Sequence, residues 1–173
     1  YLFDRDEAKA AFTEAAGHAK AAGRKVALTL SDGFCVVRHR DAFLGLIKND
    51  IDILFANEDE ITSLYSTSSF EDAVRQVGRD TQLAVLTRSE KGSTVVSGID
   101  QISVEAVPVS KVVDTTGAGD LYAAGFLFGH SQGLDHAKSA RLGSTAAAEV
   151  ISHVGARPEA NLADLAKQQG LID

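Results

Sequence analysis

The chain has 173 residues, of which 45% are hydrophobic and 24% charged, and its formal net charge is -7. This length suits one domain with a buried core, and the acidic, well-mixed charges argue against a basic face that binds nucleic acid. The sequence has no membrane-length apolar run and no signal-peptide pattern, and its single Cys35 cannot form an internal disulfide, so we expect a cytoplasmic protein without a membrane partner.

The start of the chain indicates a piece of a longer protein. Met is absent from the sequence, including at position 1, and the residues Tyr-Leu-Phe-Asp come directly before a helical pattern. A fragment would expose sheet edges and apolar surface, so we also expect self-association or marginal stability of this chain alone.

The first half of the chain alternates helical and strand patterns. Alanines at helical spacing, followed by Gly23, predict a helix from Asp6 to Ala22. The elements expected after it are a strand at Lys25–Leu30, a short amphipathic helix at Phe43–Ile47, a strand at Ile51–Ala56, and helices at about Glu58–Tyr65 and at Phe70–Gly78.

The second half of the chain predicts strands first and helices afterwards. The expected elements are a strand at Leu83–Thr87, a hairpin-like pair at Gly92–Val96 and Ile102–Val109, and helices at Leu121–His130, Asp135–Ser152 and Leu162–Gln169. The first two of these helices are rich in Ala and Gly, which suits close packing. Strands separated by crossover helices predict an α/β layered fold with a mainly parallel sheet flanked by helices, in one domain over residues 1–173.

The segment Val113-Asp114-Thr115-Thr116-Gly117-Ala118-Gly119-Asp120 carries the most chemical information. Glycines at 117 and 119 leave the backbone bare where a helix starts, so free N–H groups and the helix dipole favour a bound anion. Asp120 in the first turn is placed to accept a proton from an attacking hydroxyl. The plain alternative is a tight turn with Asp120 as a helix N-terminal residue.

The longer string, followed by Leu-Tyr-Ala-Ala-Gly-Phe, resembles the signature of the ribokinase or PfkB family of carbohydrate and nucleoside kinases. Three weaker elements follow the order of the same family: Asn57-x-x-Glu60, the strand ending at Thr87 with the loop to Gly92, and Gly155-Ala156. The resemblance extends from about Lys25 to Pro158. It implies a ribokinase-like fold in which the N-terminal part and the lid are absent.

The resemblance also implies a role for each matching residue. Asp120 would be the general base, and Gly117, Ala118 and Gly119 would offer backbone N–H groups to the γ-phosphate of ATP. Thr87, Gly92, Gly155 and Ala156 would line the nucleotide site. Asn57 and Glu60 would organise Mg²⁺ through water, and Asp114 would help to hold a potassium-like ion.

Two of these assignments have a structural alternative. Asn57 and Glu60 also fit a capping box at the start of a helix, which needs no metal. Asp114 could equally be a capping or turn residue beside Thr115. In addition, Arg88-Ser89-Glu90 departs from the Gly-containing loop that the family has after its strand.

The resemblance predicts ATP-dependent phosphotransfer to the hydroxyl of a small sugar or nucleoside, and it is compatible with a homodimer of the full-length protein. The segment from Thr29 to Cys35, with Arg38-His39-Arg40, is similar to adenosine kinase-like members, so adenosine is the first expected acceptor and ribose or fructose the second. Two alternatives stay open: a noncatalytic nucleotide-binding or regulatory module, and an NAD(P)-binding oxidoreductase domain. The second alternative is weak because Tyr122 stands where a dinucleotide-binding motif has Gly.

Overall fold

The protein is described here by a computed structural model that covers residues 2–173. Its elements in chain order are η1 (Leu2–Asp4), α1 (Asp6–Ala21), β1 (Ala27–Thr29), α2 (Gly33–Arg38), α3 (Arg40–Asn49), β2 (Ile53–Asn57), α4 (Glu58–Leu64), α5 (Phe70–Asp80), β3 (Leu83–Thr87), η2 (Ser89–Lys91), β4 (Ser93–Ser97), β5 (Asp100–Val104), α6 (Ala118–Ser131), α7 (His136–Val150) and α8 (Leu162–Gln168). None of the helices in the described range is long and apolar enough to cross a membrane.

The five strands form one sheet in the order β1-β2-β3-β4-β5. Strands β1 and β2 are parallel, with Ala27 opposite Ile53. Strands β4 and β5 are joined through Gly98 and Ile99 alone, and a connection of this length makes a hairpin of antiparallel strands. The expected α/β fold class is therefore confirmed, and the sheet contains both kinds of pairing.

The chain divides into two compact units. The first unit contains the residues up to Leu86 together with Val96–Gln101, and the second contains Thr87–Val95 together with Ile102–Asp173. The expectation of one domain over the whole chain stays a prediction.

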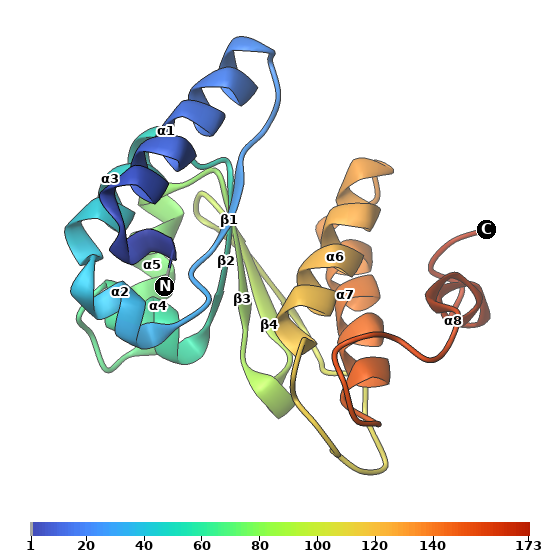
Figure 1. The fold of residues 1–173 in the computed structure, drawn as a ribbon. Coiled ribbons are helices and arrows are strands. Elements are labelled where there is room, and N and C mark those ends of the chain that lie inside the picture. The colour runs from blue at the N-terminus through green and yellow to red at the C-terminus, as the bar shows by residue number, and fades with distance from the viewer. Residues whose placement is uncertain (1) are drawn as a thin grey trace. The chain divides into compact units, whose positions relative to one another are not determined.

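The first unit has a hydrophobic core between its strands and helices. Helices α2 to α5 lie on one side of strands β1 to β3 (Figure 1). The core contains buried side chains from these helices, among them Phe43, Ile61 and Val77, and from the strands, among them Leu54 and Leu86. The first four residues of β2 and of β3 are all buried, as expected for strands that read as continuous apolar runs.

Helix α2 was not expected from the sequence. The residues Phe34-Cys35-Val36-Val37 are aromatic or β-branched or contain sulfur, and such residues favour strands or loops over helices. The helix forms because the Asp32 side chain accepts the Phe34 N–H at 3.0 Å and because α2 packs against α4, which buries Cys35 and Val36. Cys35 is a free cysteine with a buried side chain.

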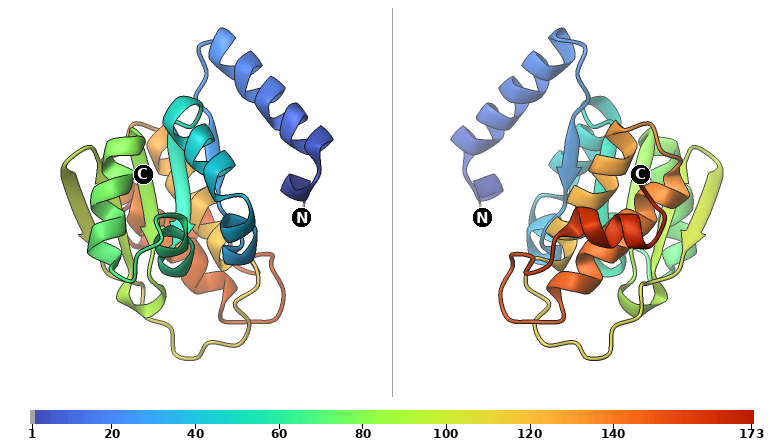
Figure 2. Two further views of the ribbon diagram at one scale, coloured as in Figure 1. Left: turned by 90° about the vertical axis from the view of Figure 1, so that its left-hand side faces the viewer. Right: turned by 90° about the vertical axis from the view of Figure 1, so that its right-hand side faces the viewer.

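The second unit is built on a close pair of helices. Helices α6 and α7 lie side by side (Figure 1), and α8 runs across the direction of α7 (Figure 2). A Cβ atom on Gly125 would lie 2.7 Å from the Leu142 carbonyl oxygen, and one on Gly143 would lie 2.6 Å from the Tyr122 carbonyl oxygen. The prediction that the Ala- and Gly-rich helices pack closely is thus confirmed.

Two predicted boundaries in this unit were wrong. Strand β5 covers Asp100–Val104 instead of Ile102–Val109. The residues after it leave the sheet, and the Val107 N–H donates to the Ser144 hydroxyl at 2.9 Å instead of to a neighbouring strand. Helix α6 begins at Ala118, three residues before the predicted Leu121, so the glycine string forms the start of the helix itself.

Candidate active site

Gly117 forms the turn that starts α6. It is the N-cap residue, and its φ of 81° lies in the left-handed region that glycine adopts without strain. A Cβ atom there would also lie 2.8 Å from the Cβ of Ala156. Both the backbone conformation and the close contact with Ala156 therefore require glycine at this position.

The backbone N–H groups that follow Gly117 differ in their partners. The Ala118 N–H donates to the Thr115 carbonyl at 3.2 Å, and the Leu121 N–H makes the first helical bond, to the Gly117 carbonyl, at 2.9 Å. Among the hydrogen bonds found for residues 2–173, none uses the N–H of Gly119 or of Asp120. These two donors are the ones that a helix N-terminus leaves for water or an anion.

The space around Gly119 is open. Apart from its chain neighbours and the backbone of its own helix, no protein atom lies within 4 Å of the position that a Cβ atom would take there. Asp120 follows in the first turn of α6, and its side chain is exposed. A ligand oxygen at this turn would thus meet unused N–H donors, the positive end of the helix and, one residue on, a carboxylate.

A cavity of about 800 Å³ in the second unit has this turn as part of its wall. Thr115, Ala118 and Gly119 line one part of it. An apolar wall consists of Val107, Pro108, Val109, Val112, Ala148 and Ile151, and hydroxyl groups come from Thr87, Ser89 and Ser144. A mostly apolar cavity of this size with a few polar groups is typical of a site for a small organic ligand.

Thr87 and Gly92 both line this cavity. Thr87 is the last residue of β3, and Gly92 follows η2 with a φ of 86°. A Cβ atom on Gly92 would lie 2.1 Å from the Val104 carbonyl oxygen. Gly92 is therefore required for the close approach of two backbone segments, whether or not it also contacts a ligand.

Asp114 joins the turn to the residues after α7. One carboxylate oxygen accepts the N–H and the hydroxyl of Thr116, at 2.9 and 2.6 Å, and the other accepts the Gly155 N–H at 3.0 Å. These donors, the Thr116 hydroxyl first among them, lower the pKa of Asp114 to about 2. Asp114 thus has the turn role that the sequence left open, and it brings Gly155 and Ala156 beside Gly117.

Asn57 and Glu60 belong to the first unit, where they form a complete capping box at the start of α4. The Glu60 carboxylate accepts the backbone N–H and the side-chain N–H of Asn57, both at 2.9 Å, and the Asn57 side chain accepts the Glu60 N–H at 2.8 Å. Burial, followed by the charges of Asp32 and Asp59, raises the pKa of Glu60 above its ordinary value. The capping alternative is thus present in the structure.

Two residues of the cavity wall that the sequence did not assign to the site, Tyr122 and Ser144, form hydrogen bonds that join its elements. The buried Tyr122 donates its hydroxyl to Ser93 at 2.7 Å, which links α6 to β4, and Ser144 on α7 holds the chain at Val107. Tyr122 sits directly after the recognised string, so its position was a usable signal. Ser144 had none, because its partner lies 37 residues away in the sequence.

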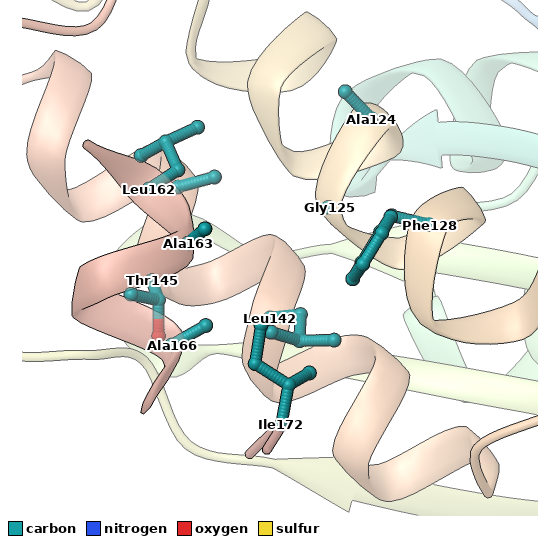
Figure 3. Close-up of a pocket in the computed structure, with 10 residues that line it drawn as sticks. Ala124, Gly125, Phe128, Leu142, Thr145, Leu162, Ala163, Ala166 and Ile172 are labelled. Carbon is teal, nitrogen blue, oxygen red and sulfur yellow. The ribbon is translucent and has the colours of Figure 1, made fainter. Parts of the chain in front are cut away.

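A second, smaller cavity of about 230 Å³ lies among α6, α7 and α8 (Figure 3). Its lining is apolar apart from Thr145, whose hydroxyl contacts the Arg141 carbonyl and the Gln169 side chain, both at 2.9 Å. This cavity therefore lacks the free donors that a phosphorylated ligand needs.

The family of the chain follows from a match that covers most of its length. Residues 4–162 match the model of the pfkB family carbohydrate kinases. The chain belongs to this family. The Gly117 turn, the Asp120 carboxylate and the 800 Å³ cavity all lie inside the matched range.

Known proteins similar to the chain are nucleoside and sugar kinases. An adenosine kinase from Sinorhizobium meliloti has a solved structure with a TM-score of 0.95 and 49% identity, and the match covers 98% of this chain and 52% of that one. A cytidine kinase from Thermococcus kodakarensis is 34% identical over 69% of this chain and 43% of its own length. Ribokinase from Arabidopsis thaliana, solved with ribose and ATP, has a TM-score of 0.67 and 27% identity over 82% of this chain and 46% of that one.

The chain thus spans about half the length of the adenosine kinase and less than half of the cytidine kinase. The family also removes the NAD(P)-binding alternative. The structure gives a physical reason, because a dinucleotide-binding turn follows a strand directly, whereas here residues 105–117 between β5 and α6 contain no strand.

Proposed function

We propose that this chain is the nucleotide-binding and base-bearing portion of a kinase that transfers the γ-phosphate of ATP to a hydroxyl of a small nucleoside or sugar. The observation that carries the proposal is the start of α6. There Gly119 lines an 800 Å³ cavity with its N–H unused and with open space at its Cβ position, and the Asp120 carboxylate follows in the same turn.

The turn supplies the two things that phosphoryl transfer needs from protein groups. Backbone N–H groups at a helix N-terminus stabilise the charge that develops on the phosphoryl oxygens. A carboxylate beside them accepts the proton of the attacking hydroxyl, which is the role proposed for Asp120. The Ala118 N–H contributes less in this state, because it donates to the Thr115 carbonyl.

The cavity suits the remainder of ATP. Its apolar wall, with Val109, Val112 and Ile151, offers contact surface to a base, and the hydroxyls of Thr87 and Ser89 offer hydrogen bonds to a sugar or phosphate. Gly92 and Ala156 act on this site through close backbone packing, and Gly155 acts through its N–H bond to Asp114. The solved ribokinase holds ATP, which supports an ATP site in this family member as well.

The capping box is compatible with Mg²⁺ held through water. The Glu60 carboxylate accepts two hydrogen bonds from Asn57 and has lone pairs left, and oxygen ligands are those that Mg²⁺ prefers. Glu60 and Asn57 are the residues that would hold it, and when bound it would neutralise phosphate charge. Asp114 keeps its proposed place near a potassium-like ion, since its low pKa leaves the carboxylate ionised.

We propose a nucleoside, with adenosine first, as the acceptor and a sugar such as ribose or fructose second. The similarity to the adenosine kinase supports this order, because its identity of 49% exceeds the 27% of the ribokinase.

The test is a phosphotransfer assay on the full-length kinase that contains this chain. ADP release is measured with Mg-ATP and, in turn, adenosine, cytidine, ribose and fructose. Saturable turnover with one of them supports the proposal, and turnover highest with adenosine supports the order. Absence of turnover with all four, in a protein that binds Mg-ATP, would favour the second candidate.

The second candidate is a noncatalytic nucleotide-binding module. Its supporting observation is that the chain matches only 43% of the cytidine kinase and 52% of the adenosine kinase. It predicts that the chain binds Mg-ATP in a calorimetric titration and yet releases no ADP with any acceptor.

A further inference from the structure

The carboxylate of Glu149 lies outside the candidate active site and has a set of contacts that the proposed chemistry does not use. Glu149 is in the last turn of α7, and its side chain is 9% exposed. One of its oxygens accepts the backbone N–H of Glu159 at 2.9 Å and that of Ala160 at 2.8 Å. The carboxylate also lies 3.4 Å from the His153 Nε2 atom.

These contacts close residues 151–160 into a loop. The loop leaves α7 at Ile151 and returns to the last turn of the same helix at Ala160. Two donated N–H groups on one buried carboxylate form a strong anchor, since hydrogen bonds to an ionised group are about twice as strong as neutral ones. Although burial opposes it, the N–H groups of Ala160 and Glu159 and the His153 side chain hold the pKa of Glu149 below its ordinary value, so the carboxylate is ionised.

The 151–160 loop contacts residues 113–117, which lead into α6, at three points. The Ile151 carbonyl accepts the Val113 N–H at 2.8 Å, and the Gly155 N–H donates to Asp114 at 3.0 Å. Ala156 packs against Gly117 so closely that no Cβ atom would fit between them. The loop thus supports the Gly117 turn through two hydrogen bonds and one packing contact.

We propose that Glu149 is a positioning residue, which fixes the Gly117 turn by anchoring the 151–160 loop that supports it. The proposal rests on the proposed function, because the turn matters for activity only if it binds phosphate. Without the carboxylate, the N–H groups of Glu159 and Ala160 lose their acceptor, and the loop loses its anchor at residues 159 and 160. Ala156 and Gly155 are then free to move away from Gly117 and Asp114.

The structural test is amide hydrogen exchange, measured by NMR on the whole chain. In Glu149→Ala we expect the amides of Thr116 and Gly155 to exchange at least about tenfold faster, as for a locally opened segment, while the amides of β2 keep their rates. Glu149→Gln retains an oxygen acceptor and should recover most of the protection. Glu159→Gln is the matched control, because it removes an exposed carboxylate but leaves the backbone N–H that Glu149 accepts.

The proposal is overturned if the amides of Glu159 and Ala160 lose protection in Glu149→Ala while those of Thr116 and Gly155 keep it. Should Glu149→Ala fail to fold, Glu149→Asp replaces it, because aspartate keeps the negative charge on a shorter side chain. The exchange rates of the same four amides are then compared, and the same outcome would overturn the proposal.

The functional test is the dissociation constant of Mg-ATP for the same variants. We expect Glu149→Ala to weaken binding by about fivefold, within the range of a coupling that acts through packed groups, and Glu149→Gln to stay within about twofold of the natural chain. Unchanged affinity in Glu149→Ala would contradict the proposal. If the natural chain binds no nucleotide, the proposed function fails, and the exchange rates alone decide whether Glu149 positions the turn.

Discussion

The N-termini of α4 and α6 contain residues that the sequence assigns to phosphoryl transfer. The two N-termini differ in whether their polar groups already have hydrogen-bond partners within the chain. At α4, Asn57 and Glu60 satisfy one another through three hydrogen bonds. At α6, the N–H groups of Gly119 and Asp120 take part in none of the hydrogen bonds found in residues 2–173. The first helix start is complete without a ligand, whereas the second needs water or an anion.

The difference shows how a capping motif and a binding motif can be separated. Both patterns place an acidic residue in the first turn of a helix, and from sequence alone each fits both roles. The side chain of Asn57 caps α4, whereas Gly117 has no side chain and cannot cap α6. Replacing the cap by glycine leaves donors that only an external group can use, which is the arrangement expected of an anion site.

Replacing the carboxylate of the second helix start should have the largest effect. We expect Asp120→Asn in the full-length kinase to lower turnover by at least about 100-fold, because the substrate hydroxyl loses its proton acceptor, with little change in the affinity for ATP. Asp164→Asn is the control, since Asp164 occupies the first turn of α8 and is also exposed. Retained turnover in Asp120→Asn would place the base at another residue.

Gly117 tests whether the conformation of the turn depends on glycine. Gly117→Ala should lower the free energy of unfolding by about 1–3 kcal/mol, because alanine would be strained at this φ and would collide with Ala156. Chemical denaturation measures this change. A variant with the stability of the natural chain would mean that the turn relaxes easily to another conformation.

Gly119 separates binding from folding in the same turn. Gly119→Leu should fold normally, since a Cβ atom there meets nothing within 4 Å beyond its chain neighbours and the backbone of its own helix. It should weaken the binding of Mg-ATP by at least about tenfold, because the side chain would occupy the space of the phosphates. Calorimetry with matched denaturation curves checks both parts, and equal affinity would move the phosphates away from this turn.

Stability should also depend on pH in opposite directions at the two helix starts, and we expect these effects to be smaller than those of the substitutions above. The raised pKa of Glu60 means that the folded chain binds its proton more readily than the unfolded chain, so this contribution to stability falls as pH rises from the ordinary value of 4.5. Glu60→Gln keeps a capping box and should remove that slope. An unchanged slope of stability against pH in the variant would contradict this assignment.

The lowered pKa of Asp114 has the reverse sign. Its contribution to stability is present above the ordinary value of 3.8 and is lost as pH falls toward about 2. Asp114→Asn should flatten the acid limb of the melting temperature between these values. An acid limb identical to that of the natural chain would show that Asp114 is not ionised in the turn.

Much of the fold was predictable because it depends on local patterns. The apolar runs at Ile53–Asn57 and Leu83–Thr87 and the helical spacing of α1 and α5 gave their elements to within a few residues. Helix α2 was missed because packing against α4 overrides its residue preferences. The start of α6 was placed too late because glycines ordinarily end helices, and here they begin one.

The site was predictable as a turn but not as a cavity. The string from Asp114 to Asp120 contains the N–H donors of the turn and the carboxylate that we propose as the base, since these are consecutive residues. The contacts of Ala156 with Gly117 and of Ser144 with Val107 join residues 39 and 37 positions apart, so no local pattern reveals them. The anchoring role of Glu149 depends on the same kind of distant contact.

The most direct test of the central claim is an NMR titration of this chain with a nonhydrolysable Mg-ATP analogue. The start of α6 as the phosphate site predicts the largest shifts at the amides of Gly117, Gly119 and Asp120, and smaller ones at the α4 capping box. Saturable binding that leaves these three amides unshifted, or no shift anywhere in the chain, would contradict it.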